Sequence, residues 1–141
     1  MIKNLFFLFC LILISCKPSV KTPESGIEKE KFESVFAKNN IQVKDYKNII
    51  IIPGSGCSGC ISEAETYFKA HSKEKENLFV FTAIGDVKIL KMKFKDSTIF
   101  GNNVFIDEKN ELVDNGFDSI YPSTATLDPD SELVKISVFS K

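Results

Sequence analysis

The sequence predicts an α/β domain whose sheet ends in an antiparallel hairpin, and three observations lead to this fold class. Four consecutive isoleucines, Ile49–Ile52, suit a strand that is buried on both faces, as in the middle of an α/β sheet. Apolar side chains at helical spacing follow that strand in Ile61–His71. Further along, two strand-like segments are joined by the turn Pro129–Ser131, which predicts the hairpin.

Along the chain, the elements are expected in the order α-β-α-β-α-β-β-β. The expected helices are Ile27–Asn39, Ile61–His71 and Val87–Phe94, and the expected strands are Asn48–Pro53, Leu78–Ile84, part of Ile99–Ile106, the segment that begins at Pro122, and Glu132–Phe139. The third helix rests on the regular succession of strands and helices, because Leu90–Lys95 alternates apolar residues with lysines as a strand would.

The first sixteen residues are typical of a bacterial export signal. Lys3 precedes the apolar run Leu5–Ile14, which would rise only about 15 Å as a helix, half of a bilayer core, and so predicts a signal peptide and not a membrane span. The run ends at Ser15-Cys16, which resembles the bacterial lipobox. That resemblance implies that Cys16 is lipidated and becomes the first mature residue; the alternative is an ordinary signal peptide with a stray cysteine.

Residues 17–25 contain two prolines together with serine and threonine, which predicts a tether. The folded domain is then expected at residues 26–141. Export would place this domain outside the cytoplasm, in the bacterial cell envelope and on the periplasmic side. Its contact with a membrane would run through the lipid on Cys16.

Charge argues against a nucleic-acid partner. The formal net charge is −1, and all 18 basic residues are lysines. A nucleic-acid-binding domain usually carries a basic excess, and arginine forms the forked contacts that phosphate recognition favours.

Only two cysteines are left for chemistry in the mature chain. Cys10 would leave with the signal and Cys16 would carry the lipid, so that Cys57 and Cys60 remain, spaced as C-x-x-C. In an oxidising compartment such a pair forms a disulfide unless it is actively reduced. Because a bridge around so small a loop gains little chain entropy, the pair favours a chemical role over a stabilising one.

The pair lies where the isoleucine strand turns into a helix. The first turn of a helix offers unpaired N–H groups and the positive end of the helix dipole, which stabilise a thiolate and lower the pKa of the thiol. We therefore expect Cys57 to be the outer, attacking sulfur and Cys60 the resolving thiol. The exchange would run through a mixed disulfide between Cys57 and the partner.

The strand, the C-x-x-C turn and the helix together resemble the thioredoxin superfamily. A second segment, Ile120–Asp128, resembles the cis-proline segment of that family, in which a proline opens a strand that ends at an acidic turn. Residues 104–117 also resemble the redoxin and TlpA-like branch. The resemblance extends over about Lys47–Phe139.

This resemblance implies a thioredoxin-like three-layer α/β/α sandwich with a mixed sheet. It implies that Pro122 faces the dithiol and takes part in catalysis, after a cis peptide bond from Tyr121. We also expect Gly56, Tyr121 and Ser123 to line a groove for the partner; for Tyr121 the alternative is a packing role. Since Lys141 follows soon after the last expected strand, we expect no C-terminal helix and one thinly covered sheet face.

Two departures from the family pattern stand out. Gly56 takes the place of the aromatic residue that usually precedes the first cysteine, and the chain has no tryptophan. Ile51 stands where the family often buries an acid, so that proton handling would fall to another group. Glu63 and Glu65 are candidates, although acids early in a helix are more often simple partners of the dipole.

The function expected from these residues is a membrane-anchored thiol–disulfide oxidoreductase. Its partners would be exported proteins with thiols or disulfides, together with an upstream electron donor or acceptor. The main alternative is a binding or assembly module with an inert disulfide. Metal handling and peroxidase chemistry are weaker, because Cys57, Cys60 and the distant His71 supply at most three ligands and the chain has no arginine. No metal or other cofactor is expected.

Overall fold

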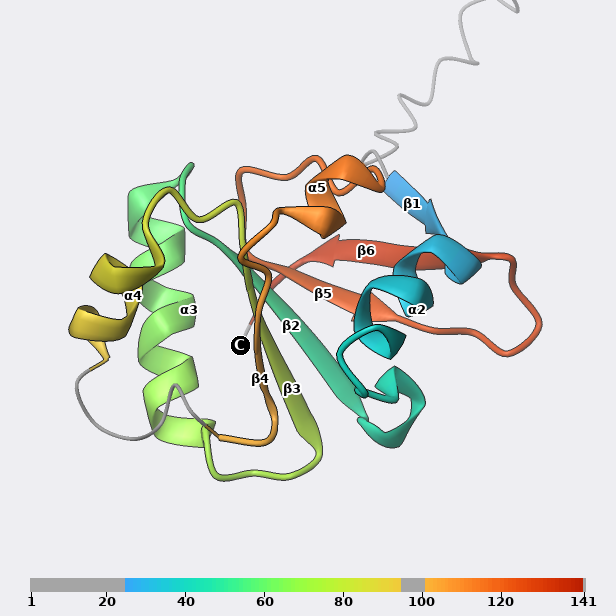
Figure 1. Cartoon of the computed structure of the whole chain (residues 1–141), viewed down its shortest axis with the longest axis horizontal. Coiled ribbons are helices and arrows are strands. Elements are labelled where there is room, and N and C mark those ends of the chain that lie inside the picture. Colours follow the sequence, from blue (N-terminus) through green and yellow to red (C-terminus); the bar gives the residue numbers. More distant parts are fainter. Residues whose placement is uncertain (1–24, 95–100, 141) are drawn as a thin grey trace, which may run out of the picture.

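The computed structural model describes residues 25–94 and 101–140 (Figure 1). The predicted signal peptide with Cys16, and the tether up to residue 24, lie outside these residues. The strands are β1 (Ser25–Glu28), β2 (Asn48–Pro53), β3 (Asn77–Thr82), β4 (Val104–Ile106), β5 (Ser123–Thr126) and β6 (Leu133–Val138). The helices are α2 (Lys29–Ala37), a 3₁₀ turn (Val43–Asp45), α3 (Ser58–His71), α4 (Val87–Lys93) and α5 (Glu111–Asp114).

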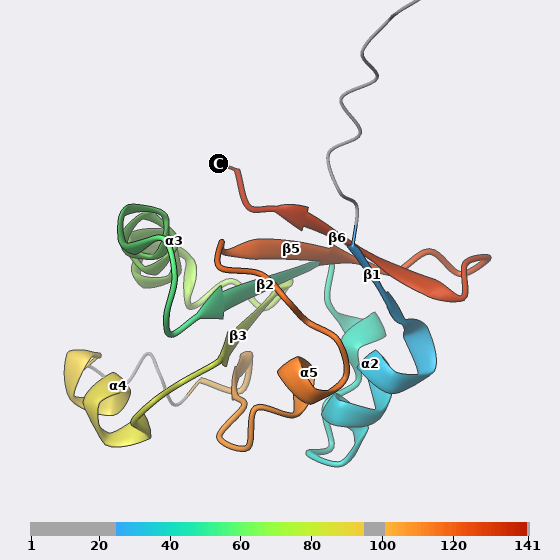
Figure 2. The same cartoon turned by 90° about the horizontal axis from the view of Figure 1, so that it is seen from above.

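The strands form one mixed six-stranded sheet in the order β1-β6-β5-β2-β3-β4. Figure 2 shows β1, β6 and β5 on one side of β2 and β3 on the other. β2, β3 and β4 are parallel, whereas β5 runs antiparallel to both β2 and β6. β2 is therefore an interior strand with a parallel neighbour on one side and an antiparallel neighbour on the other. The predicted α/β class, with a mixed sheet, is confirmed.

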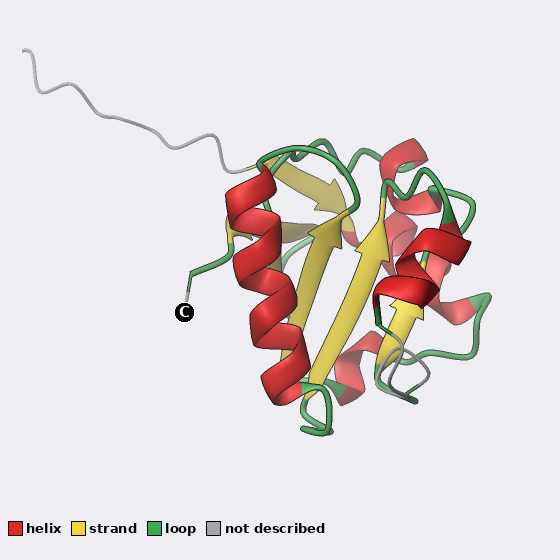
Figure 3. Cartoon of the chain, turned by 90° about the vertical axis from the view of Figure 1, so that its left-hand side faces the viewer, coloured by secondary structure: helices red, strands yellow, loops and turns green. Residues whose placement is uncertain are grey.

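The isoleucines of β2 divide between two hydrophobic cores, one on each face of the sheet. Ile49 and Ile51 belong to the core under α2 and α5, and Ile50 and Ile52 belong to the core under α3 and α4. All four are at most 2 % exposed, as the strand prediction required. Figure 3 shows the long helix α3 lying against the face of the sheet that is turned toward the viewer.

An aromatic cluster fixes α3 to the sheet and to α4. The ring of Phe68 packs edge-on against Phe79, Phe81 and Phe94, with centroid separations of 5.0, 5.1 and 5.2 Å. Such edge-to-face pairs add directional stability to the burial of apolar area. The helix that carries the dithiol is thus packed firmly against β3 and the end of α4.

The segment with alternating lysines is helical, as predicted. The Asp86 side chain accepts a hydrogen bond from the Lys88 N–H at 2.7 Å and so caps the N-terminus of α4. Leu90 and Phe94, one turn apart, then face the core. The cap and this spacing outweigh the alternating pattern.

Two parts of the predicted order are wrong. Among the described residues β1 comes first, its Ile27 pairs with Val134 of β6, and the helix expected from Ile27 starts only at Lys29. Consequently β1 forms the edge of the sheet and the β5–β6 hairpin does not. The second error is α5, which lies between β4 and β5 and was not expected.

As far as the described residues go, the outer part of the sheet is covered on one face only. Val134 and Ile136 of β6 are buried against the α2 side, whereas Lys135 and Ser137, which point to the other face, are exposed. Within the described residues no helix follows β6. The expectation of a thinly covered face is confirmed.

Candidate active site

Cys57 and Cys60 form a disulfide at the N-terminus of α3. Their Cα atoms are 5.4 Å apart, and both residues are partly exposed. Cys57 is the N-cap residue, and its carbonyl accepts the Ile61 N–H at 2.9 Å. The structure therefore places the pair at the strand-to-helix turn, where the sequence predicted it.

The N-terminus of α3 has no side-chain cap and no acidic residue in its first turn to neutralise the positive end of the helix dipole. The N–H groups of a first turn have no partner within the helix, so they can stabilise a negative charge at the cap position. This surrounding favours a thiolate on Cys57 once the disulfide is reduced.

The turn before the disulfide is wedged between two other segments of the chain. Gly56 has a φ of +134°, and a Cβ atom at this position would overlap the carbonyl oxygen of Ile120. On the other side, a Cβ at Gly54 would lie 2.8 Å from the carbonyl oxygen of Ala83. At position 56, both the positive φ and the overlap with Ile120 exclude a side chain. This explains why no aromatic residue precedes Cys57.

A backbone hydrogen bond joins the dithiol turn to the proline segment. The Cys57 N–H donates to the Ile120 carbonyl at 3.0 Å, which holds Ile120, two residues before Pro122, against the backbone of Cys57. Ile120 and Tyr121 are 56 % and 42 % exposed, whereas Pro122 is buried and its carbonyl accepts the Phe139 N–H. The described residues contain no cis peptide bond, so the Tyr121–Pro122 bond is trans, contrary to the resemblance.

The three predicted groove residues are placed differently. Gly56 and Tyr121 are exposed next to the disulfide turn. Ser123 is only 1 % exposed, and its hydroxyl donates to the Tyr121 carbonyl at 3.0 Å. Ser123 therefore holds the Tyr121 carbonyl from a buried position in β5. Its part in lining a groove stays a prediction.

The two candidate acids near the dithiol, Glu65 and Glu63, differ in exposure. Glu65 is buried, and its two carboxylate oxygens lie 2.7 and 2.6 Å from the Lys93 Nζ, which ties α3 to α4. Glu63 is exposed on α3. Ile51 is fully buried in β2, so the position that the family often gives to an acid is apolar here.

Sequence reasoning missed one buried acid, Asp107. It is 2 % exposed and accepts three hydrogen bonds, from the Thr82 hydroxyl at 2.7 Å and from the N–H groups of Glu111 and Leu112 at 2.8 and 2.9 Å. Asp107 thereby caps α5 and fastens it to the end of β3. The available signal was an aspartate at the end of a strand-like segment, just before a short helix-forming stretch.

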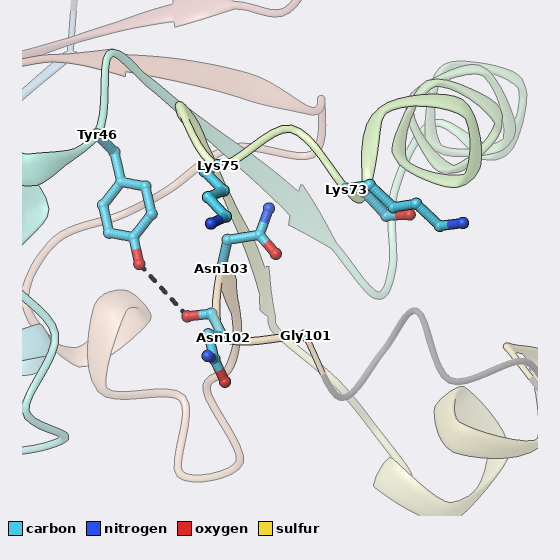
Figure 4. A pocket seen from close by; sticks show the side chains of 7 residues that line it. Tyr46, Lys73, Lys75, Gly101, Asn102 and Asn103 are labelled. Atoms are coloured by element: carbon cyan, nitrogen blue, oxygen red, sulfur yellow. Dashed lines mark hydrogen bonds between the residues drawn. The ribbon is translucent and has the colours of Figure 1, made fainter.

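One hollow in the described part of the chain lies away from all predicted site residues. It measures about 550 Å³ and is lined by Tyr46, Ser72, Lys73, Lys75 and residues 101–103 (Figure 4). Tyr46 precedes β2 and Lys75 precedes β3, whereas Cys57 follows β2. The hollow is therefore at the opposite end of the sheet from the disulfide. The Tyr46 hydroxyl donates to the Asn102 carbonyl at 3.3 Å.

In the described part of the chain, no group of three or more His, Cys, Asp or Glu residues is arranged to hold a metal ion. Nor does any helix there have the length and apolar character needed to cross a bilayer.

Neither a protein-family model, nor a curated protein, nor a solved structure matches this chain at a significant level. Its class is therefore defined by its own structure: an α/β protein with a mixed six-stranded sheet and a C-x-x-C disulfide where a central strand turns into a helix.

Proposed function

We propose that this chain is a lipid-anchored thiol–disulfide oxidoreductase of the bacterial cell envelope, with a thioredoxin-like domain. Cys57 is its nucleophile and Cys60 its resolving thiol. The partners are exported proteins with thiols or disulfides, and an upstream electron donor or acceptor resets the pair. The lipid on Cys16 attaches the protein to its membrane.

The observation that carries the proposal is the position of the disulfide. Cys57 caps a helix without acidic residues in its first turn, and its N–H is bonded to the Ile120 carbonyl beside Tyr121 and Pro122. Accessible sulfur and a helix dipole are the features that make a cysteine reactive. A disulfide that served only for stability would gain little from so short a loop.

The chain topology supports the thioredoxin-like assignment. β2 and β3 are parallel and joined through α3, whereas β5 is antiparallel to β2 and follows the proline segment. Helices lie on both faces of this sheet. This arrangement agrees with the three-layer sandwich that the sequence resemblance implies.

In the reducing direction the reaction has two exchanges. The Cys57 thiolate attacks one sulfur of a partner disulfide, a mixed disulfide forms, and the other partner sulfur leaves as a thiolate that takes up a proton. The Cys60 thiol then loses its proton and attacks the Cys57 sulfur. The Cys57–Cys60 disulfide forms and the second partner thiolate leaves, so that two electrons have passed to the partner. The oxidising direction is the reverse.

The test is a trapping experiment with the full-length chain expressed in its exported form. A Cys60→Ser variant keeps the attacking sulfur but cannot resolve the mixed disulfide. We expect it to accumulate covalent adducts with exported proteins, visible on non-reducing gels and lost on reduction. The matched control is Cys57→Ser, which should give far fewer adducts.

Measurement of the reduction potential separates this function from an inert disulfide. A potential well above about −300 mV marks a working pair, and a far lower one marks a structural bridge. Equal adduct levels in the two serine variants together with a structural potential would leave the chain as a binding or assembly module. A signal-peptide variant with Cys16→Ala should release the protein from the membrane fraction if Cys16 is lipidated.

A further inference from the structure

The segment that faces Cys57 is clamped by two serine hydroxyls. The Ser119 hydroxyl accepts the Tyr121 N–H at 3.1 Å and donates to the Tyr121 carbonyl at 2.9 Å. The Ser123 hydroxyl donates to the same carbonyl at 3.0 Å and lies 3.3 Å from the Ser119 oxygen. Both peptide polar groups of Tyr121 are thus held by what we call the serine clamp, Ser119 and Ser123.

The serine clamp holds Tyr121, the residue next to Ile120, whose carbonyl accepts the hydrogen bond from the Cys57 N–H. Ser123 is 1 % exposed and belongs to β5, which pairs with β2 in the interior of the sheet. The clamp therefore connects a buried, well-packed strand to the backbone of Cys57 through the hydrogen bond to the Tyr121 carbonyl, the peptide bond from Tyr121 to Ile120, and the hydrogen bond from the Cys57 N–H.

We infer that the serine clamp holds the Ile120 carbonyl against Cys57 and thereby sets the equilibrium between the dithiol and the disulfide, with Ser123 as a positioning residue. This inference rests on the proposed function. It deepens that function, because it assigns control of the redox equilibrium to two hydroxyls that touch neither sulfur.

The direction of the effect follows from what holds Cys57 in each redox state. In the disulfide, the covalent bond to Cys60 fixes the sulfur. In the dithiol, no covalent bond fixes the sulfur, so its place at the helix N-terminus depends more on the backbone hydrogen bonds of Cys57, and the bond to the Ile120 carbonyl is the one that comes from outside the helix. The clamp therefore stabilises the reduced form more than the oxidised form. Its loss should favour the disulfide.

The test uses the full-length chain in detergent, equilibrated with mixtures of reduced and oxidised glutathione. In this reaction two glutathione thiols reduce the protein disulfide and leave as one glutathione disulfide. We expect Ser123→Ala and Ser119→Ala each to shift the equilibrium about two- to tenfold toward the protein disulfide, the range that one net hydrogen bond implies. Alkylation of Cys57 should also require a higher pH, because its thiolate is less well stabilised.

Two controls separate positioning from a general effect on folding. Ser137→Ala removes an exposed hydroxyl on the adjacent strand, 3.4 Å from the Thr124 carbonyl, and should leave the equilibrium unchanged. Ser119→Thr keeps the hydroxyl and should behave as the wild type. Should Ser123→Ala fail to fold, the half-buried Ser119 still decides the matter.

The inference is overturned if wild-type protein exchanges with glutathione and both alanine variants keep its equilibrium constant. It is also overturned if Ser137→Ala shifts the constant as far as they do. If the wild-type disulfide is not reduced by glutathione at all, the proposed function itself fails, and this inference fails with it.

Discussion

Gly56 and Ile120 touch backbone to backbone: the carbonyl oxygen of Ile120 occupies the space that a Cβ atom on Gly56 would need. The next residue, Cys57, donates its N–H to that same carbonyl. The absence of a side chain at position 56 is therefore what lets the proline segment approach the disulfide.

Replacing this glycine should separate the two segments. In Gly56→Ala, the new methyl group meets the Ile120 carbonyl and the positive φ becomes strained, so we expect the free energy of unfolding to fall by about 1–3 kcal/mol. Urea denaturation measures this loss. Gly59→Ala is the matched control, because a Cβ there would meet nothing within 4 Å beyond its chain neighbours and its own helix backbone, and alanine favours a helix. A Gly56→Ala protein as stable as Gly59→Ala would contradict the close approach.

Asp107 should matter for stability and not for redox chemistry. Asp107→Ala leaves the Thr82 hydroxyl and two backbone N–H groups without their acceptor in a buried site, and we expect a loss of about 2–4 kcal/mol. The glutathione equilibrium should stay at its wild-type value. Asp128→Asn, in an exposed turn, should change stability by less than about 0.5 kcal/mol. A changed equilibrium in Asp107→Ala would show that this acid communicates with the sulfurs.

The ion pair between Glu65 and Lys93 should contribute measurably to the docking of α4. Lys93→Met leaves the buried carboxylate of Glu65 without its cation. Because the Lys93 side chain is 49 % exposed and water screens the pair, we expect a loss of only about 1 kcal/mol. Lys91→Met breaks a more exposed pair with Glu108 and should cost less. Comparison of the two denaturation midpoints decides this, and equal midpoints would refute the difference.

Phe68 should be the most sensitive core position of the dithiol helix. Phe68→Ala empties the centre of a cluster with Phe79, Phe81 and Phe94, and we expect a loss of about 3–5 kcal/mol. Thermal unfolding followed by circular dichroism measures it. Ile89→Ala, on the exposed side of α4, should change stability by less than about 0.5 kcal/mol. A comparable loss in both variants would argue against this cluster as the base of α3.

The parts of the fold that were predicted correctly are those with their own local signal. The isoleucine run of β2 and the apolar stripe of α3 each contain enough residues to define a buried face. β1 and α5 are only four residues long each, and their formation depends on distant partners: Val134 pairs with Ile27, and Asp107 caps α5. No local pattern in the sequence reports such pairings.

The same distinction holds within the site. The spacing of Cys57 and Cys60 and their place before a helix were evident from neighbouring residues. The sequence identified Gly56 as a departure from the family, but the reason for it lies in Ile120, far away in the chain. The serine clamp likewise forms only because residues 119–123 turn so that both hydroxyls reach the Tyr121 carbonyl.

The edge strand β1 has a mechanical consequence. The strand β1 begins at Ser25 and is held to β6 by an antiparallel ladder. Because the hydrogen bonds of such a ladder run across the strands, a pull along β1 loads them together in shear, whereas a sideways pull would break them one after another. The strands β6 and β5 separate β1 from β2, which leads into the dithiol turn. A force applied along β1 at Ser25 is thus resisted at the edge of the sheet, before it can reach the sulfurs.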